Sequence, residues 1–172
     1  MLVKIVFPLL FIGSLLASQS KETSAFHQMV EKLIAKFSAP TISVRKLRAL
    51  INSKEFHEKY ILIDTREPNE FKVSHLSGAK HGGYEDFDLK SLKPLLDKSK
   101  VIIVYCSLGY RSGVIAKDLI KAGYSVKNLS GGIFEWVNSK FSVVDQAGDK
   151  TNKIHGYNRL WGKWLTHGEV VY

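Results

Sequence analysis

The sequence has a single cysteine among its 172 residues, and this scarcity sets the first limits on the protein. One cysteine cannot form a disulfide within the chain, so the fold cannot depend on internal crosslinks. A lone thiol is either buried and inert or used in chemistry. The residue concerned, Cys106, is therefore the first functional candidate, with an inert buried thiol as the alternative.

Motifs for nucleic acids and for metals are also missing. The 25 Lys and Arg residues outnumber the 16 Asp and Glu residues and give a formal charge of +9, but no run of five basic residues occurs. This scattered pattern is typical of a solvated basic surface, and we predict no nucleic-acid partner. His75 and His81 are candidate bases or metal ligands, yet no Cys, His or carboxylate cluster has metal-site spacing. We therefore predict no metal and no cofactor.

No apolar run reaches the roughly 20 residues that a membrane-spanning helix needs. The run from Ile5 to Leu16 is interrupted by a proline, a glycine and a serine; it follows the positive Lys4 and precedes the small residues Ala17 to Ser20. That order is typical of a secretory signal peptide. We predict that residues 1–20 form such a leader and that the protein is exported, periplasmic or secreted. Retention of the leader as a membrane anchor is the alternative.

The remaining apolar pattern alternates between strands and helices. Residues 21–40 form an N-terminal segment in which helical spacing predicts an amphipathic helix over 21–37. Ser43 is the candidate N-cap of the next helix. The predicted strands are 60–63, 79–81, 101–104 and 126–129, and the further predicted helices are 43–52, 87–96, 112–122 and 133–137. This order predicts one α/β domain over residues 41–144, with a mainly parallel central sheet and helices on both faces.

The stretch from Val101 to Gly113 joins a buried strand to a helix through a short loop that begins at Cys106. A loop of this kind directs backbone N–H groups and the positive end of the helix dipole towards one point. That potential favours the thiolate, which is the reactive form of cysteine. The pattern therefore predicts a cysteine nucleophile in an anion-binding loop.

The loop also carries the side chains that an oxyanion would need. The N–H groups of residues 107–111 can cradle a thiolate, and Arg111 can bind oxygen atoms in a fork. Ser107 and Ser112 add hydroxyl donors, and Gly109 allows a tight turn.

Two charged residues, Asp64 and Arg66, follow the strand predicted over 60–63. Ligands of open α/β sheets bind at the carboxyl ends of strands, which would place both residues near the site. The alternative is that they only brace loops. Glu70 lies four positions after Arg66 and is predicted to pair with it.

Residues 145–172 form a C-terminal extension of aromatic and basic character. Its tryptophan and tyrosine side chains offer large apolar contacts with a polar end, which favours packing against the domain. The alternative is that the extension closes over the site, with His155 or Tyr157 contributing to a lid.

Four motifs together resemble those of a single-domain rhodanese, over roughly Thr41 to Phe141. They are Asp64-Thr-Arg-Glu-Pro-Asn-Glu-Phe71, His75-Leu-Ser-Gly-Ala79, Tyr105-Cys-Ser-Leu-Gly-Tyr-Arg-Ser112 and Leu129-Ser-Gly-Gly-Ile-Phe-Glu-Trp136. The resemblance implies a sulfurtransferase in which Cys106 takes sulfur from a small anionic donor such as thiosulfate. The resulting persulfide would pass its sulfur to cyanide or a thiol. The implied substrate-binding residues are Ser107, Leu108, Gly109, Tyr110, Arg111 and Ser112, with Asp64 and Arg66 in support.

Two other functions compete with this one. The first is a phosphatase-like enzyme on the same fold, since related phosphatases have a loop one residue longer and a histidine before the cysteine. This chain has six residues from Cys106 to Arg111, and Tyr105 precedes the cysteine, which argues against that function. A sulfur carrier or redox sensor with little turnover is the non-enzymatic alternative. We predict a monomer that contacts a membrane only if the leader is retained.

Overall fold

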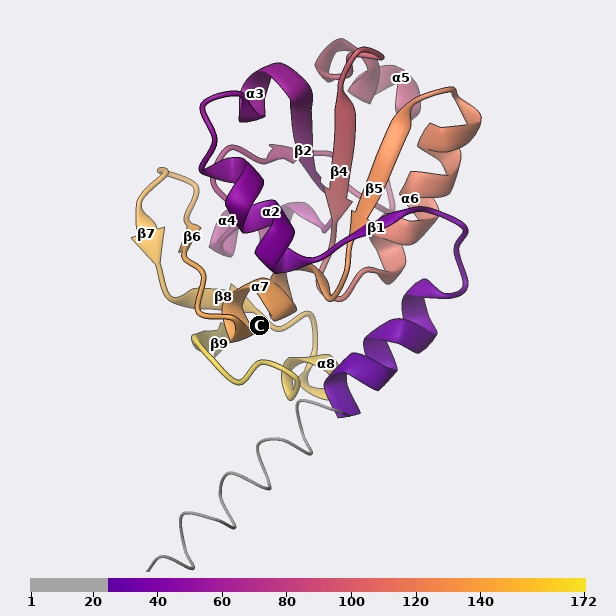
Figure 1. Ribbon diagram of the computed structural model, residues 1–172. Coiled ribbons are helices and arrows are strands. Elements are labelled where there is room, and N and C mark those ends of the chain that lie inside the picture. The colour runs from indigo at the N-terminus through magenta and orange to yellow at the C-terminus, as the bar shows by residue number, and fades with distance from the viewer. Residues whose placement is uncertain (1–24) are drawn as a thin grey trace, which may run out of the picture.

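A five-stranded parallel sheet forms the centre of the computed structural model, which describes residues 25–172 (Figure 1). The strand order is β1-β5-β4-β2-β3. The strands are β1 (Thr41–Ile42), β2 (Tyr60–Asp64), β3 (Lys80–His81), β4 (Val101–Tyr105) and β5 (Ser125–Leu129). This arrangement confirms the predicted α/β fold with a mainly parallel sheet. The predicted leader over residues 1–20 lies outside the described residues.

Helices cover both faces of the sheet, as predicted. One face packs against α2 (Val44–Ile51), α3 (Phe56–Lys59) and α7 (Gly132–Asn138). The other packs against α5 (Leu89–Leu92) and α6 (Tyr110–Lys121). A further helix, α4 (Pro68–Val73), follows β2.

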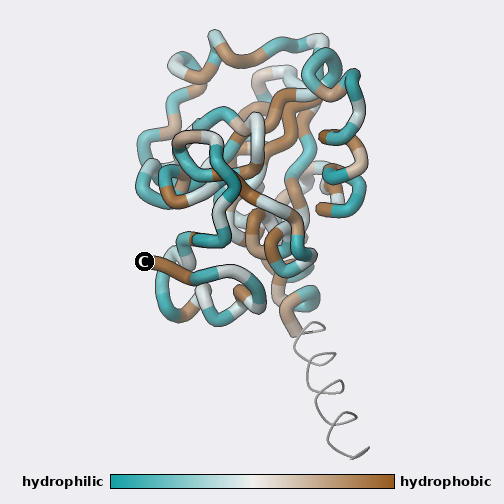
Figure 2. Tube along the Cα trace, turned by 90° about the vertical axis from the view of Figure 1, so that its left-hand side faces the viewer, coloured by the Kyte–Doolittle hydropathy of each residue, from teal (hydrophilic) through white to brown (hydrophobic). Residues whose placement is uncertain are grey.

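The central strand β4 shows why the sheet is buried on both sides. Ile103 and Tyr105 belong to one core cluster, while Ile102 and Val104 belong to the other. Alternate side chains of a strand point to opposite faces, so an uninterrupted apolar run is what a doubly covered strand requires. Figure 2 shows the hydrophobic residues concentrated along these strands.

The bounds of α2 and α7 lie within one residue of the predicted ones, whereas those of other predicted helices differ. Ser43 caps α2, since its Oγ accepts from the Lys46 N–H at 3.3 Å. The single helix predicted over 87–96 is wrong: α5 is followed by a 3₁₀ turn, η1 (Lys93–Leu95). Pro94 lacks an N–H and cannot continue an α-helix through its interior, which accounts for the shorter α5. The helix after Cys106 begins at Tyr110, two residues earlier than predicted.

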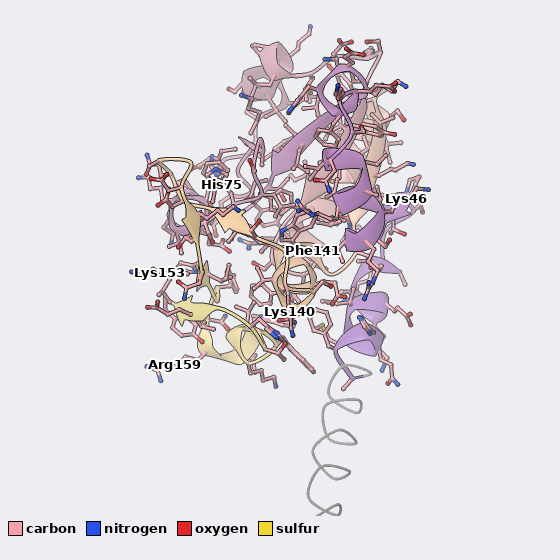
Figure 3. All side chains as sticks on the ribbon, turned by 60° about the vertical axis from the view of Figure 1, so that its left-hand side comes forward. Lys46, His75, Lys140, Phe141, Lys153 and Arg159 are labelled. Atoms are coloured by element: carbon pink, nitrogen blue, oxygen red, sulfur yellow. The ribbon has the colours of Figure 1, made fainter. Side chains whose placement is uncertain are left out.

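The two segments that flank the domain lie together at one end of it (Figure 1). The N-terminal segment is helical over residues 25–34 and buries Phe26 and Val30 in the core. β6 (Val143–Val144) closes the predicted domain, and the C-terminal extension contains β7 (Lys150–Thr151), β8 (Lys153–His155), α8 (Arg159–Gly162) and β9 (Glu169–Val171). Ile154 is fully buried and Trp164 packs against the same core, whereas Lys153 and Arg159 project outward (Figure 3). Within residues 25–172 no helix has both the length and the apolar character to cross a bilayer.

Candidate active site

Cys106 directly follows β4, and the loop that it begins leads into α6. Gly109, the N-cap of α6, has a φ of +106°, a left-handed conformation that glycine adopts without strain. This turn brings the Gly109 N–H to Cys106 Sγ, to which it donates at 3.1 Å. The first N–H groups of a helix have no partner within it, so the start of α6 presents free donors beside the sulfur. The structure therefore places backbone donors at the Cys106 sulfur, as an anion-binding loop would require.

Neighbouring elements hold this loop in place from behind. The N–H groups of Ile133 and Phe134, in α7, donate to the carbonyl oxygens of Cys106 (2.9 Å) and Ser107 (3.1 Å). Asn128 of β5 donates from Nδ2 to the Gly109 carbonyl at 2.7 Å. The loop conformation thus depends on contacts from two other elements.

Ser112, predicted as a substrate-binding residue, takes part in this support. Its side chain is fully buried, and its Oγ donates to Asn128 Oδ1 at 2.7 Å. The hydroxyl therefore faces β5 and orients the amide that fixes the loop. This geometry gives Ser112 a positioning role in place of contact with a substrate.

Glu70 reaches the loop from α4. Pro68 lies in the first turn of α4, and the Glu67 N–H donates to Glu70 Oε2 at 3.1 Å, as in a capping box. The same carboxylate accepts from Arg111 Nη1 at 2.5 Å and from Nη2 at 2.8 Å. Ser107 Oγ donates to Glu70 Oε1 at 3.1 Å, and Arg111 Nη2 contacts Ser107 Oγ at 3.0 Å. Two of the predicted donors are therefore engaged with a buried carboxylate.

The charge state of Glu70 follows from this network. Burial by itself raises the pKa of Glu70, but the hydrogen bonds and charge of Arg111, together with the charge of Arg66, lower the pKa below its ordinary value. The ionised carboxylate neutralises Arg111. The predicted pairing of Glu70 with Arg66 is wrong, because Arg66 pairs with Asp64.

Asp64, the last residue of β2, forms a fully buried ion pair with Arg66. Arg66 Nε contacts both Asp64 oxygens at 3.0 and 3.1 Å, and Nη2 contacts Oδ2 at 2.7 Å. Arg66 Nη2 also donates to the Ser74 carbonyl at 2.6 Å. These contacts join β2 to the end of α4. This is the geometry expected if the two residues brace loops.

A pocket of about 360 Å³ opens in front of Cys106. The cysteine itself is only 2% exposed. The loop contributes five lining residues, namely Cys106, Ser107, Leu108, Tyr110 and Arg111. The segments before α4 and after β3 contribute Glu67, Tyr84 and Glu85, and the flanking segments contribute Leu33, Tyr157 and Trp161.

The C-terminal extension thus packs against the domain and also forms a wall of the pocket. The Tyr157 ring lies over the Arg111 guanidinium, 4.8 Å from the ring centroid to Cζ. Tyr157 has a φ of +62°, and its N–H donates to His155 Nδ1 at 3.0 Å. His155 is buried beside Asn69, and this burial lowers its pKa. Tyr157 is therefore the member of the predicted lid pair that faces the pocket.

The two other histidines singled out in the sequence have structural partners. His75 stacks on Phe71 with 3.9 Å between ring centroids, and its Nδ1 lies 3.1 Å from the Phe71 carbonyl. His81 Nε2 lies 2.8 Å from the Arg66 carbonyl. Among residues 25–172, no group of three or more His, Cys, Asp or Glu side chains could hold a metal ion.

The sequence analysis did not identify Glu70, Asn128 or the pocket-lining residues Glu67 and Glu85 as parts of the site. A signal for Glu70 existed, because Glu67-Pro-Asn-Glu70 has the spacing of a helix-start motif that turns the second glutamate back towards the chain. Asn128 lies in an apolar strand, where a buried amide needs partners. Neither signal identifies the partner residue.

Comparisons with known proteins agree with this geometry. The model of the rhodanese-like domain matches residues 43–139. The uncharacterized protein YqhL of Bacillus subtilis is 34% identical over 96 residues, which are 54% of this chain and 75% of YqhL. The thiosulfate sulfurtransferase GlpE of Stutzerimonas stutzeri is 31% identical over 86 residues, or 49% of this chain and 77% of GlpE.

Structural similarity extends further along the chain. The crystal structure of BH2092 from Bacillus halodurans has a TM-score of 0.54 at 26% identity and covers 73% of this chain and 88% of that one. Several other curated relatives are longer, and the match spans only 21–32% of their length.

Proposed function

We propose, from the premise that this chain belongs to the rhodanese-like domain family, that it is an exported sulfurtransferase acting through a Cys106 persulfide. The donor would be thiosulfate or a similar compound of sulfane sulfur, and the acceptor cyanide or a thiol. One observation carries the proposal: Cys106 Sγ lies at the base of a pocket and accepts the Gly109 N–H at the start of α6. GlpE, which is named a thiosulfate sulfurtransferase, supports the choice of chemistry.

The reaction follows from the position of the sulfur. The Cys106 thiolate attacks the outer sulfur of thiosulfate and forms a new S–S bond, while the donor's own S–S bond breaks and its electron pair leaves with sulfite. The persulfide carries the negative charge that the thiolate carried before. The Gly109 N–H and the free donors of the first turn of α6 stabilise that charge. Cyanide or a thiolate then takes the outer sulfur and restores the Cys106 thiolate.

The length of the loop supports sulfur over phosphate as the transferred group. Cys106 to Arg111 spans six residues, and Tyr105, which precedes the cysteine, is fully buried with its hydroxyl accepting the Leu76 N–H at 3.0 Å. A sulfur carrier with little turnover is a second candidate. The neutralisation of Arg111 by Glu70 favours it, because a neutralised guanidinium binds donor oxygens weakly.

Intact-mass spectrometry after treatment with a sulfane-sulfur donor tests the proposal. The expected result is a gain of one sulfur, about 32 Da, that is removed by reduction and is absent from Cys106→Ser. Thiocyanate formation in the presence of cyanide distinguishes a turning-over enzyme from a carrier that loads once. No adduct with any donor would overturn the sulfurtransferase proposal. The mass of the protein recovered from an exporting host also reports whether residues 1–20 have been removed.

A further inference from the structure

The pocket in front of Cys106 has an unusual composition for a site that must receive a dianion. We propose that it selects an organic sulfur donor with an apolar body and a single negative charge over the thiosulfate dianion. This inference rests on the proposed function and narrows the class of donor. It is carried by two features, the charge around the sulfur and the apolar part of the pocket wall.

The charge at the pocket is unfavourable for a dianion. Arg111 is the one cationic side chain among the described lining residues, and both of its terminal nitrogens contact Glu70. The Tyr157 ring covers the guanidinium face at 4.8 Å. An incoming anion therefore meets an arginine whose charge is paired with Glu70 and whose two terminal nitrogens already donate hydrogen bonds.

Two acidic residues line the same space. Glu67 and Glu85 both line the pocket, and Glu67 Oε1 accepts the Glu85 N–H at 3.2 Å. This contact joins the two segments in an acidic rim, defined here as Glu67 and Glu85. The rim repels a dianion twice as strongly as a monoanion at the same position, because Coulomb energy is proportional to charge.

Another part of the pocket wall is apolar and comes from segments outside the family match. Leu33, Tyr157 and Trp161 line the pocket but lie outside the residues 43–139 that match the family model. Leu108, which is 6% exposed, extends this apolar surface next to Cys106. A volume of about 360 Å³ falls within the range of about 300–1,000 Å³ typical of small-molecule pockets. The structure thus provides apolar contact for a donor larger than thiosulfate.

Organic thiosulfonates have the chemistry that such a pocket would accept. In benzenethiosulfonate a phenyl group replaces one anionic oxygen of thiosulfate, which leaves one negative charge. The Cys106 thiolate attacks the terminal sulfur and forms the persulfide, while the S–S bond of the donor breaks and its electron pair leaves with benzenesulfinate. No oxidant or reductant is needed, and the total charge is unchanged by the step.

Three donors with the same reaction separate the two features. The three donors are thiosulfate, methanethiosulfonate and benzenethiosulfonate. For each, kcat/KM with cyanide as the acceptor is divided by the rate of the same donor with a free small thiol, which corrects for the intrinsic reactivity of the donor. We expect benzenethiosulfonate to exceed thiosulfate by at least about tenfold, with methanethiosulfonate between them. The thiosulfate value should rise with ionic strength more steeply than the values for the two monoanions, because salt screens the larger repulsion more.

Two variants with matched controls assign the effects to residues. In Glu85→Gln, the factor by which kcat/KM rises for thiosulfate should be about the square of the factor for methanethiosulfonate. Glu58→Gln, an exposed charge removal in α3, should leave the donor ratio unchanged. Trp161→Ala should lower the preference for phenyl over methyl, whereas Trp164→Ala, which removes a core-packing tryptophan outside the pocket, should not.

The outcomes separate this inference from the proposed function. The inference would be overturned if thiosulfate had the highest kcat/KM after division by the free-thiol rate, if all three corrected values were equal, or if phenyl gave no gain over methyl. Sulfur transfer itself would still stand in each of these cases. No persulfide with any of the three donors would overturn the proposed function. Folding of each variant is checked by circular dichroism, so that a loss of rate is not mistaken for a loss of selectivity.

Discussion

The buried pair of Asp64 and Arg66 permits the most direct test of how this fold is held together. Both side chains are fully buried, and Arg66 also donates to the Ser74 carbonyl. Burial by itself lowers the pKa of Arg66, but the charge and hydrogen bonds of Asp64 raise it above the ordinary value, so the guanidinium stays charged. The perturbation is a double-mutant cycle of Asp64→Asn, Arg66→Met and the two combined.

The expected magnitudes follow from what each change leaves unpaired. Asp64→Asn leaves a buried guanidinium without its counter-charge, which costs about 3–5 kcal/mol of unfolding free energy. Arg66→Met leaves a buried carboxylate and costs a similar amount. The double variant holds no charge at the site of the former pair and chiefly orphans the Ser74 carbonyl, at about 1–3 kcal/mol. The two single costs together therefore exceed the double by at least about 3 kcal/mol.

Urea unfolding followed by tryptophan fluorescence measures these values, because Trp136 is buried in the core. The total stability of a domain is only about 5–15 kcal/mol, so each single variant should have a clearly lower urea midpoint. Sulfur transfer by the folded fraction should be unchanged if the pair only braces loops. A cost of under about 1 kcal/mol for Asp64→Asn, or single costs that simply add, would refute the reasoning.

Two further predictions concern residues of α4 and α7 that lie against the Cys106 loop. Glu70→Gln should flatten the pH dependence of stability. The pKa of Glu70 is lower in the folded state than its ordinary 4.5, so its stabilisation is present above about pH 4.5 and is lost as the pH falls further. Parallel urea midpoints of wild type and variant from pH 6 to pH 3.5 would contradict this. Gly132→Ala should cost about 2–5 kcal/mol, because its Cβ would lie 2.2 Å from the Cys106 carbonyl at a φ of +55°. Gly148→Ala, at a φ of +91° with no described atom within 4 Å of the added Cβ, should cost only about 1–2 kcal/mol; equal losses of midpoint for the two would exclude the steric cause.

The class of fold, and the position of the cysteine proposed as the nucleophile, could be predicted from the sequence. Uninterrupted apolar runs such as Val101 to Tyr105 require a sheet that is covered on both faces. Ser43 marks a helix start and Gly109 a tight turn through their own local chemistry. These features were predictable because each depends on residues within a few positions of one another.

Only the tertiary structure decided how the charges of the site are distributed. Arg111 and Glu70 are 41 positions apart, and the sequence equally allowed Glu70 to pair with Arg66 on the spacing of a helical turn. The choice was made by the strand order, which brings α4 next to the Cys106 loop and buries Asp64 against Arg66 first. A buried charge takes the partner that the packing places within hydrogen-bond distance, and that distance is not encoded in any short stretch of sequence. The same reason explains why the Tyr157 ring over Arg111 was visible only in the folded chain.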